Sequence, residues 1–109
     1  MSQTNAIILR LRQEHADTFE SLFRTEVLPL WHEFKDKGKF LSASLTPVHA
    51  GNQQRPGVRD YILHVEVPSM SEHEEFDSDP RFLDFLRKVR PALQAEDPLV
   101  WLGPTLFQV

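Results

Sequence analysis

A histidine and a glutamate that could exchange protons lie two residues apart in the segment 58–67. Polar and apolar residues alternate along this segment, which predicts a β-strand whose successive side chains point to opposite faces. His64 and Glu66 therefore share one face with Asp60. A carboxylate beside an imidazole can hold the ring and tune it near neutral pH, so this face carries candidate acid–base chemistry.

Arginines would extend this polar face if the segment 6–12 forms the neighbouring strand. The same alternation places Arg10 on the side of that strand opposite to its leucines. Arg10 and Asp60 would then join His64 and Glu66 in one polar network. Two interpretations stay open: catalysis by these residues, or an ion network that fixes the register of a dimer interface without reacting.

From Tyr61 to Val67 the other face of this strand carries Tyr61 and otherwise only apolar residues, namely Leu63, Val65 and Val67. With side chains of the predicted helices, it could line a pocket for a small apolar or aromatic molecule, and Tyr61 would be the polar group that orients the ligand. The candidate lining residues are Phe19, Phe23, Trp31, Val67, Phe76 and Phe82. The same side chains would equally form an ordinary hydrophobic core.

A long helix is predicted over 15–37, where apolar residues recur at spacings of three and four. Pro29 lies inside this pattern and removes one helical hydrogen bond, so we expect a kink or break at 25–28. Gly38 is expected to cap the end of the helix, because glycine readily adopts the left-handed conformation found there.

A second helical region follows the strand 58–67 and has two start signals. Ser69 and Ser71 are each followed three residues later by a glutamate, which is the spacing of a capping box, and the sequence leaves the choice between them open. Asp79 and Pro80 then predict a second start, because aspartate caps free N–H groups and proline tolerates the first helical position.

Two further strands complete the chain, at 40–49 and 99–109. Glu96-Asp97-Pro98 is expected to break the pattern before the last strand, and Gly103-Pro104 to interrupt it. The element order is βαββαβ. This order predicts an α+β, ferredoxin-like fold in which a four-stranded antiparallel sheet carries two helices on one face. With 109 residues, we expect a single domain over 1–109.

Composition excludes several classes of function. The chain has no cysteine and a net charge of −4 without a basic stripe, which argues against disulfides, thiolate metal sites and nucleic-acid binding. No apolar run reaches membrane-spanning length and no signal peptide is evident, so a cytoplasmic protein is expected. Histidines occur in different elements without metal-binding spacing, namely His15, His32, His49, His64 and His73. We expect neither a metal nor a cofactor.

Apolar residues on both faces of the sheet predict a homodimer. The helices cover one face, yet Ile8 and Ile62 belong to the other, and the last strand is apolar on both sides. Each fully buried large apolar side chain contributes about 1.5–3 kcal/mol, so a second copy packed sheet on sheet would stabilise this surface.

This element order resembles the dimeric α+β barrel superfamily, in particular its antibiotic-biosynthesis-monooxygenase-like group. The likeness is clearest over 66–82, where a strand ending in an acidic residue leads into a serine turn, a short helix and a proline before a phenylalanine; the Glu26–Pro29 ending of the first helix is similar to the NIPSNAP branch. The resemblance implies a barrel of two paired sheets with a small-molecule pocket between sheet and helices. It also implies reactions such as cofactor-independent oxygenation, haem degradation or lactone isomerisation.

Two departures bear on the activity. Where the group often has tryptophan after the acidic residue and histidine later in the short helix, this chain has Val67 and Phe76. These losses argue against haem degradation. His73 lies one turn earlier in the short helix and could replace the missing histidine only if that helix were rotated. The leading hypothesis is a small-molecule-binding dimeric barrel, with Tyr61, His64 and Glu66 as the polar residues of a monooxygenase-like site. A non-catalytic stress-associated or interaction dimer and an isomerase-type acid–base catalyst are the alternatives.

Overall fold

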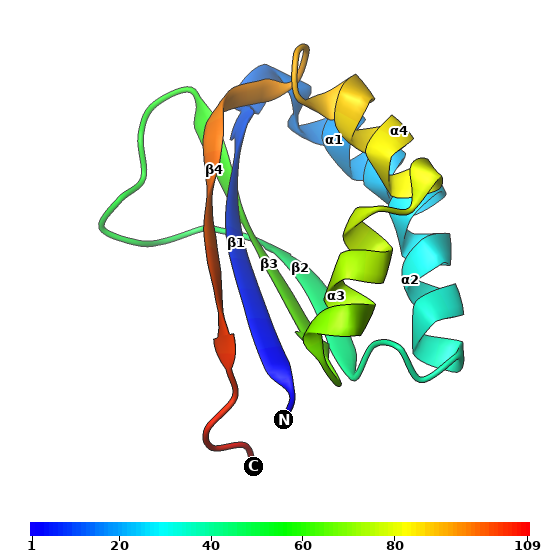
Figure 1. The fold of residues 1–109 in the computed structure, drawn as a ribbon. Coiled ribbons are helices and arrows are strands. Elements are labelled where there is room, and N and C mark those ends of the chain that lie inside the picture. Colours follow the sequence, from blue (N-terminus) through cyan, green and yellow to red (C-terminus); the bar gives the residue numbers. More distant parts are fainter.

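A computed structural model describes all of residues 1–109. The elements are β1 (Gln3–Arg12), a 3-10 turn (Gln13–His15), α1 (Ala16–Leu22), a π-helical turn (Phe23–Val27), α2 (Leu28–Asp36), β2 (Ser42–Pro47), β3 (Val58–Val67), α3 (Met70–Asp77), α4 (Pro80–Val89) and β4 (Gln94–Pro104). The helices form one layer over a four-stranded sheet (Figure 1). This is the predicted ferredoxin-like α+β arrangement. None of the helices has the length and apolar character needed to cross a membrane.

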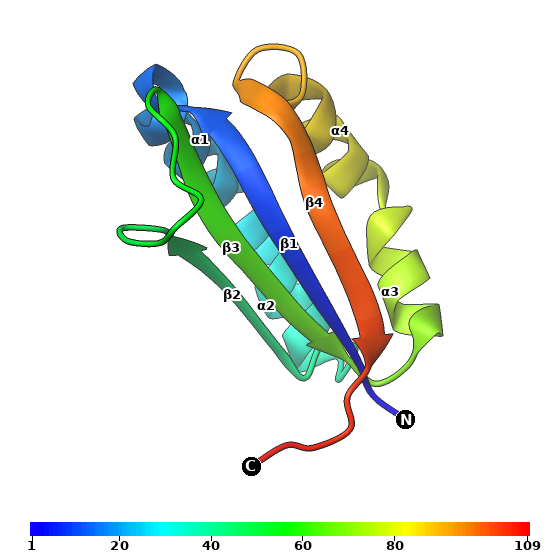
Figure 2. The ribbon, with the colours of Figure 1, turned by 90° about the vertical axis from the view of Figure 1, so that its left-hand side faces the viewer.

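The sheet has the strand order β2-β3-β1-β4, and all its pairs are antiparallel. Ile8 of β1 lies between Ile62 of β3 and Leu99 of β4. Directly paired residues share a face, so this register separates a helix-covered face from an open face. Figure 2 views the sheet from the open side, with the strands in front of the helices. The core lies on the other side, between sheet and helices.

The first helical region is interrupted where proline was expected to disturb it. α1 runs into the π-helical turn Phe23–Val27, and α2 begins at Leu28 with Pro29 in its first turn. The wider turn is consistent with proline being unable to donate the backbone hydrogen bond that a continuous α-helix needs. The helical path is therefore disturbed near the expected position, by a π-helical turn and not by a break. Gly38 has a φ of 71° and follows the helix end, as a C-terminal cap should.

The structure decides which of the two serines, Ser69 or Ser71, caps the first helix of the second helical region. Ser69 is the N-cap of α3, and its hydroxyl accepts a hydrogen bond from the backbone N–H of Ser71 at 3.3 Å. The same hydroxyl donates to the Glu72 carboxylate. In α4, Asp79 accepts from the backbone N–H of Arg81 at 2.8 Å and Pro80 is the first helical residue, as predicted.

The last strand differs from the prediction. It spans Gln94–Pro104 and includes Asp97-Pro98, where a break was expected, whereas residues 105–109 form a tail without regular structure. β4 is an edge strand, so the N–H that Pro98 lacks can face away from the sheet. Its pairing with β1 shifts register around Arg10, which accommodates the irregular start.

Candidate functional site

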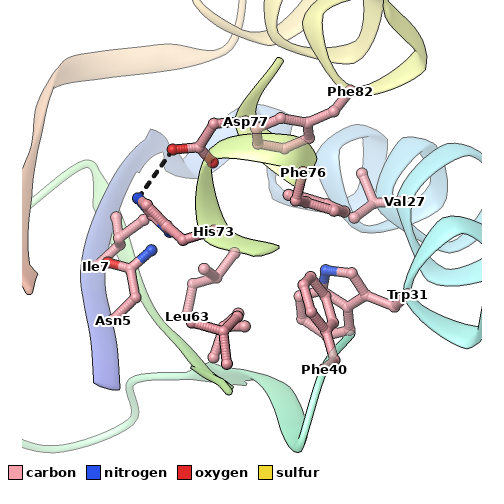
Figure 3. Close-up of a pocket in the computed structure, with 12 residues that line it drawn as sticks. Asn5, Ile7, Val27, Trp31, Phe40, Leu63, His73, Phe76, Asp77 and Phe82 are labelled. Atoms are coloured by element: carbon pink, nitrogen blue, oxygen red, sulfur yellow. Dashed lines mark ion pairs between the residues drawn. The ribbon is translucent and has the colours of Figure 1, made fainter. Parts of the chain in front are cut away.

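A small cavity lies between the sheet and the helices, on the covered face. Its volume is about 30 Å³, room for a water molecule or two. The walls are mostly apolar and come from β1, β3, the first helical region, α3 and α4 (Figure 3). The lining residues central to the site are Asn5, Trp31, Phe40, His73, Phe76 and Asp77.

Polar groups meet on one side of this cavity. Asn5 is 5% exposed and its carboxamide oxygen is buried without a hydrogen-bond partner. His73 Nε2 lies 3.1 Å from Asp77 Oδ2, one helical turn further along α3. Partial burial raises the pKa of the Asp77 carboxyl, and the nearby His73 opposes that rise. Figure 3 shows this group facing Trp31 and Phe40 across the cavity.

The aromatic candidates divide between cavity and core. Trp31, Val67 and Phe76 line the cavity, together with Phe82. Phe19 and Phe23 do not; both are buried in the hydrophobic core, 0% and 5% exposed. A continuous pocket lined by all the candidate side chains is therefore not present.

Tyr61 is buried on the covered face but does not reach the cavity. Its hydroxyl donates to Glu20 Oε2 at 2.6 Å. Burial, and secondarily this hydrogen bond, raises the pKa of Tyr61. The residue borders a surface hollow between α1 and the edge strand β2, so space does exist beside Tyr61, outside the core.

His64 and Glu66 lie on the open face, as their alternation predicts. Glu66 is 3% exposed, and its carboxylate accepts hydrogen bonds from Gln108 Nε2 at 2.6 Å and from the Ser2 hydroxyl at 3.3 Å. No hydrogen bond or ion pair joins Glu66 to His64. The terminal segments of the chain hold this carboxylate, and an acid–base role for the pair stays a prediction.

At the other end of the open face, the polar network is built around Glu96 and not around Asp60 and His64. Arg10 is paired with Asp60 across β1 and β3, yet its guanidinium forms an ion pair with Glu96 of β4. Arg55 binds the same carboxylate. The Asp60 Oδ1 atom is buried without a partner. Glu96 therefore ties the loop before β3 to β1 and β4.

Acid should weaken this arrangement through Glu96. The hydrogen bonds from Arg55 and then Arg10 lower the pKa of its carboxyl from 4.5 to about 2. Between these values the unfolded chain binds more protons than the folded one, so the stabilisation is complete above pH 4.5 and is lost as pH falls to about 2. Glu96→Gln should flatten the dependence of unfolding free energy on pH in this window.

Urea unfolding of both proteins at several pH values measures the effect. Glu14→Gln is the control, because Glu14 is exposed and forms no ion pair. If the unfolding free energies of wild type and Glu96→Gln changed equally with pH, Glu96 would not be the group whose protonation weakens the fold.

Sequence reasoning missed the polar group in the cavity. Asn5 continues the covered-face alternation of β1, and the spacing of His73, Phe76 and Asp77 places them on one side of α3. That spacing was available as a signal, but the acidic neighbours made the segment resemble a solvated helix start. No group of three or more histidine or acidic side chains lies close enough together to hold a metal ion.

Solved structures share this architecture over nearly their full length. A candidate antibiotic biosynthesis monooxygenase from Caulobacter crescentus has a TM-score of 0.73 and 19% identity, covering 97% of this chain and 91% of that one. A protein from Mycobacterium tuberculosis has a TM-score of 0.77 and 15% identity, with coverages of 99% and 98%. The chain shares the ferredoxin-like α+β fold of these proteins.

A third similar structure bears on assembly. It is a dimeric protein of unknown function with a ferredoxin-like fold from Bacteroides fragilis, with a TM-score of 0.68 and 11% identity over 95% of this chain and 96% of that one. No family model and no curated protein matches the sequence. At these identities the similarity establishes the ferredoxin-like fold alone, and the chemistry has to be argued from the site.

Proposed function

We propose that this protein binds a small, largely apolar molecule in the cavity lined by Asn5, Trp31 and His73 and acts on it as a cofactor-independent monooxygenase-like enzyme. The observation that carries the proposal is the buried Asn5 oxygen without a partner. Buried polar groups are almost always hydrogen-bonded, so an unpaired acceptor facing a cavity is suited to a ligand that donates a hydrogen bond.

His73 supplies the proton acceptor. The Asp77 carboxylate, 3.1 Å from Nε2, stabilises the imidazolium that forms when His73 takes a proton from an acidic O–H or C–H group of the ligand. The electron-rich anion left behind can then react with dioxygen. For a reacting CH2 group, one oxygen atom of O2 becomes the carbonyl oxygen and the other leaves as water with the two hydrogens of the CH2 group, and the substrate supplies all four electrons.

The cavity must enlarge to accept such a ligand. It measures about 30 Å³. An apolar cavity that binds benzene has a volume of about 150 Å³. A wall therefore has to move when a ligand of that size binds, and we expect binding to be coupled to a conformational change.

Binding of 1-naphthol tests this proposal, with fluorescence of Trp31 as the signal in a Trp101→Phe background. We expect His73→Ala and Asn5→Ala to weaken binding about tenfold each, because each removes one hydrogen-bonding partner from a largely apolar site. His64→Ala is the matched control, since His64 lies on the other face of the sheet. No binding by the parent protein, or an equal loss in His64→Ala, would refute the site.

We further propose that the open face pairs with a second copy of the chain, so that residues 1–109 form one half of a barrel. Exposed apolar side chains support this: Ile62 is 39% exposed, Leu99 41% and Trp101 65%, and register places all of them on that face. A contiguous apolar surface of this kind is typical of an interface. The dimeric protein from Bacteroides fragilis has the same fold.

A further inference from the structure

The cavity and the surface of the molecule meet at Trp31. Two hollows lie along the edge strand β2, with volumes of about 330 and 440 Å³. Both are bordered by Leu28, Trp31 and Ala43, so we call them together the edge groove. Trp31 also lines the cavity. One indole ring therefore lies between the buried cavity and the edge groove.

Trp31 and Phe76 are both 7% exposed, but Trp31 packs against fewer aromatic rings. The Phe76 ring packs against the rings of Phe34, Phe40 and Phe82, at centroid distances of 5.2, 5.0 and 4.6 Å. The Trp31 ring packs edge-on against Phe23 at 5.0 Å, and the edge groove provides space beside it. Moving Phe76 would disrupt a packed cluster, whereas Trp31 can turn toward open space.

We propose that Trp31 is the gate of the cavity and that ligands reach the site through the edge groove. This inference rests on the proposed function of the cavity. When the indole turns into the groove, it opens a passage between α2 and β2 and leaves additional volume behind it. A single side-chain movement then explains both how a ligand enters and how a cavity of about 30 Å³ becomes large enough to hold it.

The groove has the character needed for an apolar ligand. Leu28 is 38% exposed and Leu41 42%, although both are large apolar residues. Ala43 has a small side chain and borders both hollows together with Trp31. The opposite end of the cavity is polar, because His73 and the half-exposed Asp77 lie there. An apolar molecule would therefore approach from the edge groove and meet the polar groups last.

Filling the edge groove should both slow and weaken binding, because the displaced indole would no longer fit in the groove. Leu28→Phe and Ala43→Phe add bulk in front of Trp31 but lie outside the cavity lining. We expect each to lower the association rate constant of 1-naphthol about tenfold and to weaken its affinity by a similar factor. Leu102→Phe is the control, because Leu102 lies on β4, at the sheet edge opposite to β2, and lines neither the cavity nor the edge groove.

Indole relaxation-dispersion NMR provides a second measurement that needs no ligand. In the Trp101→Phe background, Trp31 should exchange between two environments on the microsecond-to-millisecond timescale, and Leu28→Phe should suppress this exchange while Leu102→Phe leaves it unchanged. Exchange without binding of 1-naphthol would support the gate and refute the proposed ligand site. Binding with no exchange and unchanged rates in the groove variants, or slower rates in Leu102→Phe alone, would overturn the gate.

Discussion

Phe19→Ala should lower the free energy of unfolding by about 3–5 kcal/mol, which is a large share of the 5–15 kcal/mol that typically stabilises a domain. Phe19 is 0% exposed, and its ring lies 4.9 Å from that of Tyr61 and 6.2 Å from that of Phe85. Truncation would remove the contact between α1 and β3 and leave a void that a packed core cannot fill.

Urea unfolding at a fixed protein concentration measures this effect, because association would otherwise change the apparent stability. Leu83→Ala is a suitable control, since Leu83 is a large apolar residue of α4 that is 42% exposed. Leu83→Ala should lower the free energy of unfolding by less than about 1 kcal/mol. Similar losses for the two variants would mean that Phe19 is not at the centre of the core.

Trp101→Glu should dissociate the proposed homodimer, weakening association by about a thousandfold or more. Trp101 is 65% exposed on the open face, and a charge there would lie unpaired within an apolar interface. Analytical ultracentrifugation over a range of concentrations gives the dissociation constant.

Val100→Glu provides a close comparison for this experiment. Val100 is the preceding residue of β4 and is 60% exposed, but its side chain points to the other face of the sheet. A sheet-on-sheet dimer should survive this change. Wild-type protein that is a folded monomer at micromolar concentration, or equal dissociation by both variants, would exclude the open face as the interface.

The two faces of the sheet have different proposed roles, ligand binding on the covered face and association on the open face. Asn5 and His73 lie on the covered side, where ligand chemistry is proposed, and Trp101 lies on the side proposed for association. The edge groove, into which Trp31 is proposed to turn, lies along β2 on the helix-covered side of the sheet. A second copy on the open face would therefore leave the edge groove accessible.

The fold was largely predictable because it depends on patterns within each element. Alternation over Val58–Val67 identified β3 and its two faces, and Asp79-Pro80 located the start of α4. Both signals are local, since strand geometry and helix capping depend on neighbouring residues. The disturbance of the helix near Pro29 has the same origin.

The boundaries of β4 were less predictable. Pro98 is a strong local signal against a strand, but an edge position tolerates it, and edge position is a property of the whole sheet. The short tail was misassigned for a related reason. Residues 105–109 are apolar enough for a strand, yet they extend beyond the end of the β1–β4 pairing.

The sequence by itself determined the elements, the two faces of the sheet and the surplus of apolar side chains on the open one, because these follow from side-chain periodicity along the chain. Only the tertiary structure decided which polar groups meet. Asn5 and His73 are far apart in sequence, and their shared cavity depends on the rotation of α3 over the sheet. Likewise Glu66 finds its partners in Ser2 and Gln108, which only the folded chain brings together.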